Sequence, residues 1–142
     1  AIERIEVSAF YRNGISIEST HASDPGFTNV SIAGCEVHDN GNNGIESAGV
    51  FRPGAVPHFP HKNIVVRDCE VHHNPGRAGL QSHTGSGIIL AFVDGALIEY
   101  CEAHHNGGQN NAPGGGPVGI WGWEVNNLVI QFCESHHNES QG

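Results

Sequence analysis

The stretch Cys69-Glu70-Val71-His72-His73-Asn74 (CEVHHN) decides the fold, because it is one of four similar hexapeptides in the chain. The hexapeptides share an initial Cys, a Glu beside it and a closing Asn, and they occupy residues 35–40, 69–74, 101–106 and 133–138. Their cysteines are 34, 32 and 32 positions apart, and a weaker copy begins at Ile5, 30 positions before Cys35. Spacing this regular is typical of repeat proteins in which each repeat forms one structural turn.

Each repeat contains three short segments in which apolar and polar residues alternate. The first follows Asn or Gly and occupies residues 29–32, 63–66, 95–98 and 127–130. The second is the Cys-Glu-x-His unit, and the third begins with Gly-Ile at Gly14, Gly44, Gly87 and Gly119. Because alternation is typical of half-buried strands, we expect three short strands per repeat, with Cys facing in and Glu and His facing out.

Three short strands cannot bury a core alone, but coils stacked with equivalent strands in parallel can. The closing Asn of each hexapeptide supports such a stack. Asn tolerates the left-handed backbone conformation of a tight corner, and its amide can hydrogen-bond along the stack.

The repeated pattern N-x-x-I-x-x-C-x-V-x-x-N, followed by G-I-x-I, resembles the right-handed parallel β-helix of the pectate-lyase-like superfamily. The resemblance covers essentially the whole chain. It implies an all-β solenoid of about four to five coils, with residues 1–142 in a single domain. Leucine-rich repeats are the alternative fold, but their Leu-x-x-Leu-x-Leu pattern is absent.

Composition excludes several classes of partner. The net charge is −9 with only six Lys and Arg, which disfavours nucleic acid and anionic membranes. No apolar run is long enough for a membrane span. The four cysteines share one repeat position, which predicts buried free thiols, and a zinc site would lack the usual close Cys pairing.

The chain begins and ends in mid-pattern. We therefore interpret it as part of a longer protein, and we expect self-association through the uncapped ends of the solenoid.

Inserted residues collect around the Gly-Ile strands. Residues 19–28 and 49–62 follow a Gly-Ile strand, whereas residues 75–86 and 107–118 precede one. Loops on both sides of one strand would enclose a cleft over its outer face. In polygalacturonases, which share the scaffold, a G-I-S-I strand carries the active face, and residues 14–17 are similar.

The resemblance does not extend to the polygalacturonase aspartates. Asn13, Asn43, Ser86 and Val118 stand where these enzymes have them. The calcium carboxylates and basic residue of pectate lyases are not evident either.

Glu18 and Glu46 are the candidate catalytic carboxylates. We expect them in neighbouring coils and nearly the same column, where they could act as acid and base or hold Ca²⁺. His83 is predicted to assist as an acid or base. Other loop residues that could join them are His21, Asp24, His58 and His61. The alternative is a solvated acidic rim with loop-capping histidines.

Trp121 and Trp123 are two positions apart, so both project from one face of one strand. Exposed paired indoles are suited to the C–H faces of sugars. The alternative is that they pack under residues 107–118. Arg52 and Arg77 are the predicted substrate-binding cations.

The second strands present columns of Glu and His. We expect a structural ladder there and assign no metal ligands, although a metal strip of Glu-x-His pairs is the alternative. Seven His and five Glu belong to these columns.

These observations predict a carbohydrate-active module, a polysaccharide lyase or glycoside hydrolase, that acts on an acidic or neutral polysaccharide. We expect it to be secreted or at the surface of a microbial cell. The alternative is a non-catalytic solenoid, such as a stalk, adhesin or filament segment, which has no need of long loops flanking one strand.

Overall fold

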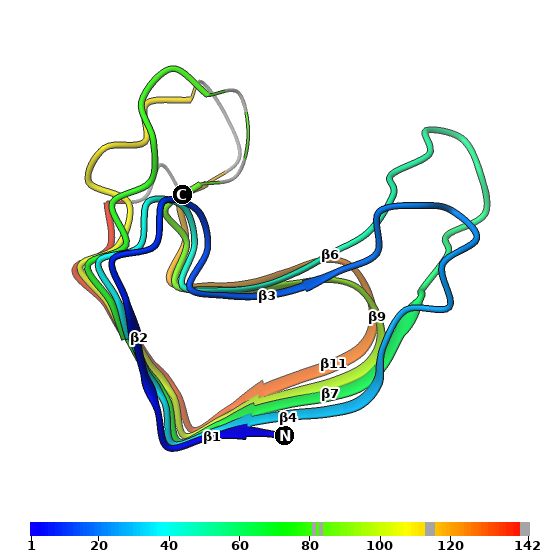
Figure 1. Cartoon of the computed structure of the whole chain (residues 1–142), viewed down its shortest axis with the longest axis horizontal. Helices are drawn as coiled ribbons and strands as arrows, with labels where there is room; N and C mark the ends of the chain where they lie inside the picture. The colour runs from blue at the N-terminus through cyan, green and yellow to red at the C-terminus, as the bar shows by residue number, and fades with distance from the viewer. Residues whose placement is uncertain (81, 83, 113–115, 140–142) are drawn as a thin grey trace.

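The repeats stack as coils, and each strand lies parallel to its equivalent in a neighbouring coil (Figure 1). The computed structural model describes residues 1–80, 82, 84–112 and 116–139. The strands in these residues are β1 (Ile2–Glu3), β2 (Glu6–Ser8), β3 (Ile15–Glu18), β4 (Thr28–Ala33), β5 (Glu36–His38), β6 (Ile45–Ala48), β7 (His61–Arg67), β8 (Glu70–His72), β9 (Ile88–Glu99), β10 (Glu102–His104), β11 (Ile120–Gln131) and β12 (Glu134–His136). The prediction of an all-β parallel solenoid, with about four turns, is confirmed.

One sheet is built from the hexapeptides, and we call it the CEVHHN sheet. Its strand order is β12-β10-β8-β5-β2. The register aligns the same letter of every copy, so that Glu6 pairs with Glu36, Glu36 with Glu70, and Glu70 with Glu102. The weaker first copy is therefore a true repeat.

The other sheet carries the two remaining sides of each coil. β7 pairs with the second half of β9, and β4 and then β1 continue the sheet beyond β7. β6 pairs with the first half of β9, and β3 pairs with β6. β9 and β11 bend at Phe92 and Glu124, which have φ of 58° and 48°. Residues 19–27 and 49–60 form loops at the same corner in the earlier coils. A loop and a single left-handed residue thus turn the same corner in different coils.

The core is a set of columns inside the coils. Its fully buried side chains include Ile32, Ile64, Val66 and Ile98. Cys35, Cys69 and Cys101 are 2% exposed, and the four cysteines are free thiols. The inward orientation of Cys predicted from the alternation is confirmed for these coils.

A ladder of Asn side chains holds one corner together. The backbone N–H and the Nδ2 of Asn74 both donate to Oδ1 of Asn106, at 3.1 and 2.9 Å. Asn40 makes the same pair of bonds to Asn74. Each Nδ2 also donates to a carbonyl of the preceding coil, as Asn106 does to Val71. The closing Asn of the hexapeptide is therefore a structural residue, as the sequence predicts.

The Gly of each Gly-Ile pair is required because the chain passes close to this ladder. A Cβ at Gly44 would collide with the Val71 side chain and lie 2.8 Å from the carbonyl oxygen of Gly87. No room for a methyl group remains there, so the position is restricted to Gly.

Long loops flank the Gly-Ile strands on both sides, as predicted. Figure 1 shows residues 19–27 and 49–60 beyond one end of β3 and β6, and the described parts of 75–86 and 107–118 beyond the other. The described residues contain no helix that is long and apolar enough to cross a membrane.

Candidate functional site

The outer face of the Gly-Ile strands carries two columns of side chains that change from coil to coil. The register places Ser16 beside Glu46, Glu46 beside Ile89, and Ile89 beside Trp121. In the next column Glu18 lies beside Ala48, and Ala91 lies beside Trp123. The face therefore combines carboxylates in the early coils with indoles in the last one.

The register corrects the predicted placement of the two carboxylates. Glu18 and Glu46 stand in adjacent columns of neighbouring coils, because Glu46 pairs with Ser16 and Glu18 pairs with Ala48. Strand spacing and rise place their Cα atoms roughly 8 Å apart on this diagonal. The two groups are close enough for the charge of Glu18 to raise the pKa of Glu46.

The two carboxyl groups have different environments. Burial raises the pKa of Glu46, a hydrogen bond from Asn43 Nδ2 at 3.1 Å partly opposes this, and the charge of Glu18 adds to it. Glu18 is exposed and accepts a hydrogen bond from Ser16 Oγ at 2.7 Å. Protonation is therefore favoured at Glu46 relative to an ordinary Glu.

A pocket of about 260 Å³ lies over this face. Ile89 and Ala91 form its apolar base, each 3% exposed. Its polar wall includes Arg12, Asn42, Asn43, Glu46, Ser82 and Thr84. The pocket therefore has an apolar and a polar side, as sugar sites commonly do.

Both indoles lie at this face, but in different surroundings. Trp123 lines the pocket and packs on Phe92 and Phe51, with ring centroids 5.2 Å away in each case. Trp121 Nε1 donates to Ser86 Oγ at 3.2 Å. Both side chains are half-buried, so each keeps part of its surface accessible.

The predicted cations lie apart from each other. Arg52 is exposed and lines a second pocket of about 220 Å³ with Phe51, His58 and Glu124. Arg77 lies over the ring of Tyr11, with the guanidinium carbon 4.6 Å from the ring centroid. His83 lies outside the described residues.

His61 does not belong to the site. It is fully buried, its Nδ1 accepts from the Phe27 N–H at 3.2 Å, and its Nε2 donates to the Ala48 carbonyl at 2.8 Å. Phe27 ends the first long loop, and Ala48 precedes the second. His61 therefore holds the bases of the two loops together.

Two further residues of the pocket wall, Arg12 and Asn42, are not predicted from the sequence. Asn42 is 8% exposed, and its Oδ1 has no hydrogen-bond partner among the described residues, although it lies on the pocket wall. A buried acceptor without a donor is costly, so it favours a ligand that supplies one. Neither residue stands on a strand, and only the fold brings them to the pocket.

The residues that replace the polygalacturonase aspartates form a second ladder. Asn13 Oδ1 accepts from the Asn43 N–H at 3.2 Å, and Asn43 Oδ1 accepts from the Ser86 N–H at 2.8 Å. Ser86 Oγ accepts from the Val118 N–H at 3.3 Å. These positions therefore support the pocket from one side.

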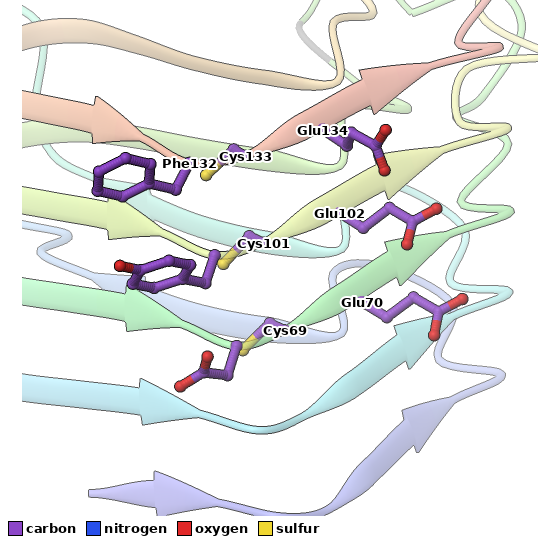
Figure 2. Close-up of a pocket in the computed structure, with 9 residues that line it drawn as sticks. Cys69, Glu70, Cys101, Glu102, Phe132, Cys133 and Glu134 are labelled. Carbon is purple, nitrogen blue, oxygen red and sulfur yellow. The ribbon is translucent and has the colours of Figure 1, made fainter.

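A third hollow, of about 700 Å³, lies at the corner before the CEVHHN sheet. Figure 2 shows Cys69, Cys101 and Cys133 stacked at this corner, with Glu70, Glu102 and Glu134 in a column beyond them. The rings of Tyr100 and Phe132 stack on its rim, with centroids 5.1 Å apart. Both rings stay largely exposed, so the hollow offers an aromatic face beside its acidic groups.

Among the described residues, one cluster of three potential metal ligands has its ligand atoms within 4.8 Å of one another: Glu102, Glu134 and His136. It lies on the CEVHHN sheet and includes neither Glu18 nor Glu46. A Ca²⁺ ion at the Gly-Ile face stays a prediction.

The comparisons with known proteins agree with this architecture. The family model described as right-handed beta helix region matches residues 1–142. Neither the curated proteins nor the solved structures contain a significant match. Because the matched region spans the chain, the protein belongs to the right-handed β-helix family.

Proposed function

We propose that the chain is a carbohydrate-active β-helix module that binds a polysaccharide over the Gly-Ile strands. One observation carries the proposal: the 260 Å³ pocket combines the Trp123 ring, the partly buried Glu46 carboxyl and the unpartnered Asn42 oxygen. A sugar presents an apolar C–H face and several hydroxyl donors, so it matches all three groups.

The flanking loops support a chain-like ligand rather than a small one. They lie beyond both ends of the Gly-Ile strands, and the pocket walls come from both sides. Arg12 and Arg52 add positive charge to a strongly acidic chain, which suits an acidic polysaccharide. Neutral polysaccharides remain the alternative, and binding at raised salt distinguishes the two.

The two glutamates support hydrolase or lyase chemistry. Glu46, whose pKa is raised, would protonate the leaving oxygen, and the exposed Glu18 would act as the base. Glu46→Gln should abolish cleavage while leaving binding largely intact.

The test is binding and cleavage of a panel of acidic and neutral polysaccharides. Trp123→Ala should weaken binding by roughly tenfold, which corresponds to one stacked aromatic ring of about 1.4 kcal/mol. Phe132→Ala removes an exposed ring from another face and is the matched control. Reducing ends report hydrolysis, and a new ultraviolet absorbance from an unsaturated sugar reports lyase activity. An equal loss of polysaccharide affinity in Trp123→Ala and Phe132→Ala would contradict the placement of the site over the Gly-Ile strands.

A non-catalytic solenoid is the second candidate. The continuous register of the CEVHHN sheet through all its strands favours it, because a stalk needs regular stacking and no cleft. It predicts that no polysaccharide binds and that Trp123→Ala has no effect beyond stability. We place either function outside a microbial cell, which fractionation of the producing organism would test.

A further inference from the structure

The histidines of the hexapeptides form two rows on the outside of the CEVHHN sheet. The inner row is His38, His72, His104 and His136, and adjacent rings stack with centroids 4.9 to 5.1 Å apart. The outer row is His73, His105 and His137, stacked at 5.0 and 5.1 Å. Asp39 occupies the outer position of the first coil.

Inner and outer histidines of one coil meet through their Nδ1 atoms. The Nδ1–Nδ1 distances are 2.7 Å for His72 and His73, 2.8 Å for His104 and His105, and 2.7 Å for His136 and His137. The two ring planes are almost perpendicular, at 88° to 89°. Two bare nitrogen lone pairs would repel at this distance, so either a proton or a metal ion must lie between them.

A glutamate of the preceding coil fixes the tautomer of each inner ring. His104 Nε2 lies 3.1 Å from Glu70 Oε1, and His136 Nε2 lies 2.9 Å from Glu102 Oε1. A carboxylate only accepts, so Nε2 carries the hydrogen and Nδ1 of the inner ring keeps a free lone pair. A carboxylate behind a histidine is the arrangement that orients histidine ligands in metal sites.

Without an ion, each Nδ1–Nδ1 distance is that of an N–H···N hydrogen bond, and the same distance also suits one class of metal ion. Two bonds of about 2.0 Å that meet near 90° subtend roughly 2.8 Å, whereas a tetrahedral ion needs roughly 3.3 Å. Square-planar and tetragonal ions bind nitrogen ligands at this angle, and Cu²⁺ binds them most tightly of the divalent series.

We propose that each pair of Nδ1 atoms, in His72 and His73, His104 and His105, and His136 and His137, chelates Cu²⁺. On binding, the hydrogen of the outer ring moves from Nδ1 to Nε2, so both rings stay neutral and both lone pairs point at the ion. Water completes the coordination. Both ligand nitrogens must be unprotonated to bind the ion.

The backbone does not by itself require histidine at the outer positions. Asp39, His73, His105 and His137 have left-handed φ angles of 51° to 53°. Asn and Asp accept this conformation as readily as His does. Asn at all three outer positions is therefore a substitution that keeps the corner and removes the chelate.

The test is a competitive Cu²⁺ titration of tag-free protein against a chromophoric chelator. The triple variant should raise the dissociation constant of the first Cu²⁺ ion more than tenfold; it combines His73→Asn, His105→Asn and His137→Asn. The matched control combines His21→Asn and His58→Asn, exposed histidines outside the rows, and should bind within twofold of the unmodified chain. The proposal would be overturned if the triple variant bound Cu²⁺ as tightly as the unmodified chain, or if the control lost as much affinity as the triple variant.

Two further measurements keep the test independent of that variant's folding. A second triple variant should lower the affinity for Cu²⁺ by roughly 10- to 100-fold, because the inner rings lose the carboxylates that orient them. It combines Glu36→Gln, Glu70→Gln and Glu102→Gln. Pulsed electron paramagnetic resonance on the unmodified chain should find two equatorial imidazoles on a tetragonal Cu²⁺. A spectrum with one imidazole or none would overturn the proposal.

Discussion

The CEVHHN sheet and the Gly-Ile face are built on the same coils, but they differ in whether equivalent positions of successive coils carry the same residue. Glu6, Glu36, Glu70 and Glu102 stand in register in the first, one Glu above another. In the second, the column that begins at Ser16 continues with a Glu, an Ile and a Trp. One face repeats a residue, and the other replaces it in every coil.

This difference separates scaffold from site. Stacking favours the same side chain where that side chain bonds both to its equivalent and to the backbone of the next coil, as in the ladder of closing Asn residues. Where the residue in a column changes from coil to coil, stacking does not determine which residue stands there. Ligand binding can then determine it. A repeated face can hold only a repeated site, which is what the histidine pairs would form.

The largest expected effect is at the Asn ladder. Asn106→Ala removes bonds to Asn74, Val71 and Asn138 and leaves buried groups unsatisfied. We expect the free energy of unfolding to fall by about 3–4 kcal/mol. Urea denaturation measures this. Asn126→Ala, an exposed Asn bonded to Asp94, is the matched control and should cost less than about 1 kcal/mol. Similar values for both would show that the ladder is not structural.

The next effect is at the Gly column. Gly44→Ala places a methyl group against Val71 and the Gly87 carbonyl, and overpacking of this kind costs about 2–3 kcal/mol. A Cβ at Gly108 would meet only the Glu139 side chain, at 3.9 Å, so Gly108→Ala should leave the stability nearly unchanged. A thermal melt compares the two. A stable Gly44→Ala protein would mean that the Gly-Ile strands have room to move outward.

A smaller effect concerns the first coil, where Asp39 replaces the outer histidine. A hydrogen bond with Asp39 at 2.7 Å raises the pKa of His38. This contribution to stability is complete below the ordinary histidine pKa and is lost as pH rises through the raised value. Asp39→Asn should therefore lower the pKa of His38 and destabilise the protein mainly below pH of about 6.5. NMR titration of the His38 ring measures the first effect, and melts across this range measure the second. A His38 pKa that does not change would contradict the assignment.

The smallest effect is self-association of the chain. β11 pairs with β9 and leaves its other edge open among the described strands, and Val129 and Phe132 nearby are 50% and 69% exposed. Sizing at several concentrations should show a shift toward larger species, and Val129→Lys should reduce it. A monomer at every concentration would contradict this prediction.

The sequence predicts the repeated features well because each is specified several times over. The Asn, Cys and Gly columns and the placement of the loops all follow from one period of about 32 residues. The flanking loops also predicted a hollow over the Gly-Ile strands, and a pocket lies there. The diagonal placement of Glu18 and Glu46 is also specified by the repeat, because aligning Gly14 with Gly44 sets Ser16 beside Glu46, and the expectation of a shared column overlooked this two-residue offset. The packing of Trp123 on Phe51 and the burial of His61 depend on loop contacts that have no period.

Both tryptophans of the chain, Trp121 and Trp123, lie on the Gly-Ile face, so their fluorescence reports on that face alone. Titrating the protein with the polysaccharides of the panel while recording this emission tests directly whether the changing columns form the site. The account predicts a saturable change for at least one polysaccharide, largely lost in Trp123→Phe and retained in Phe132→Ala. A polysaccharide that binds without changing the emission, or a panel with no binding at all, would contradict it.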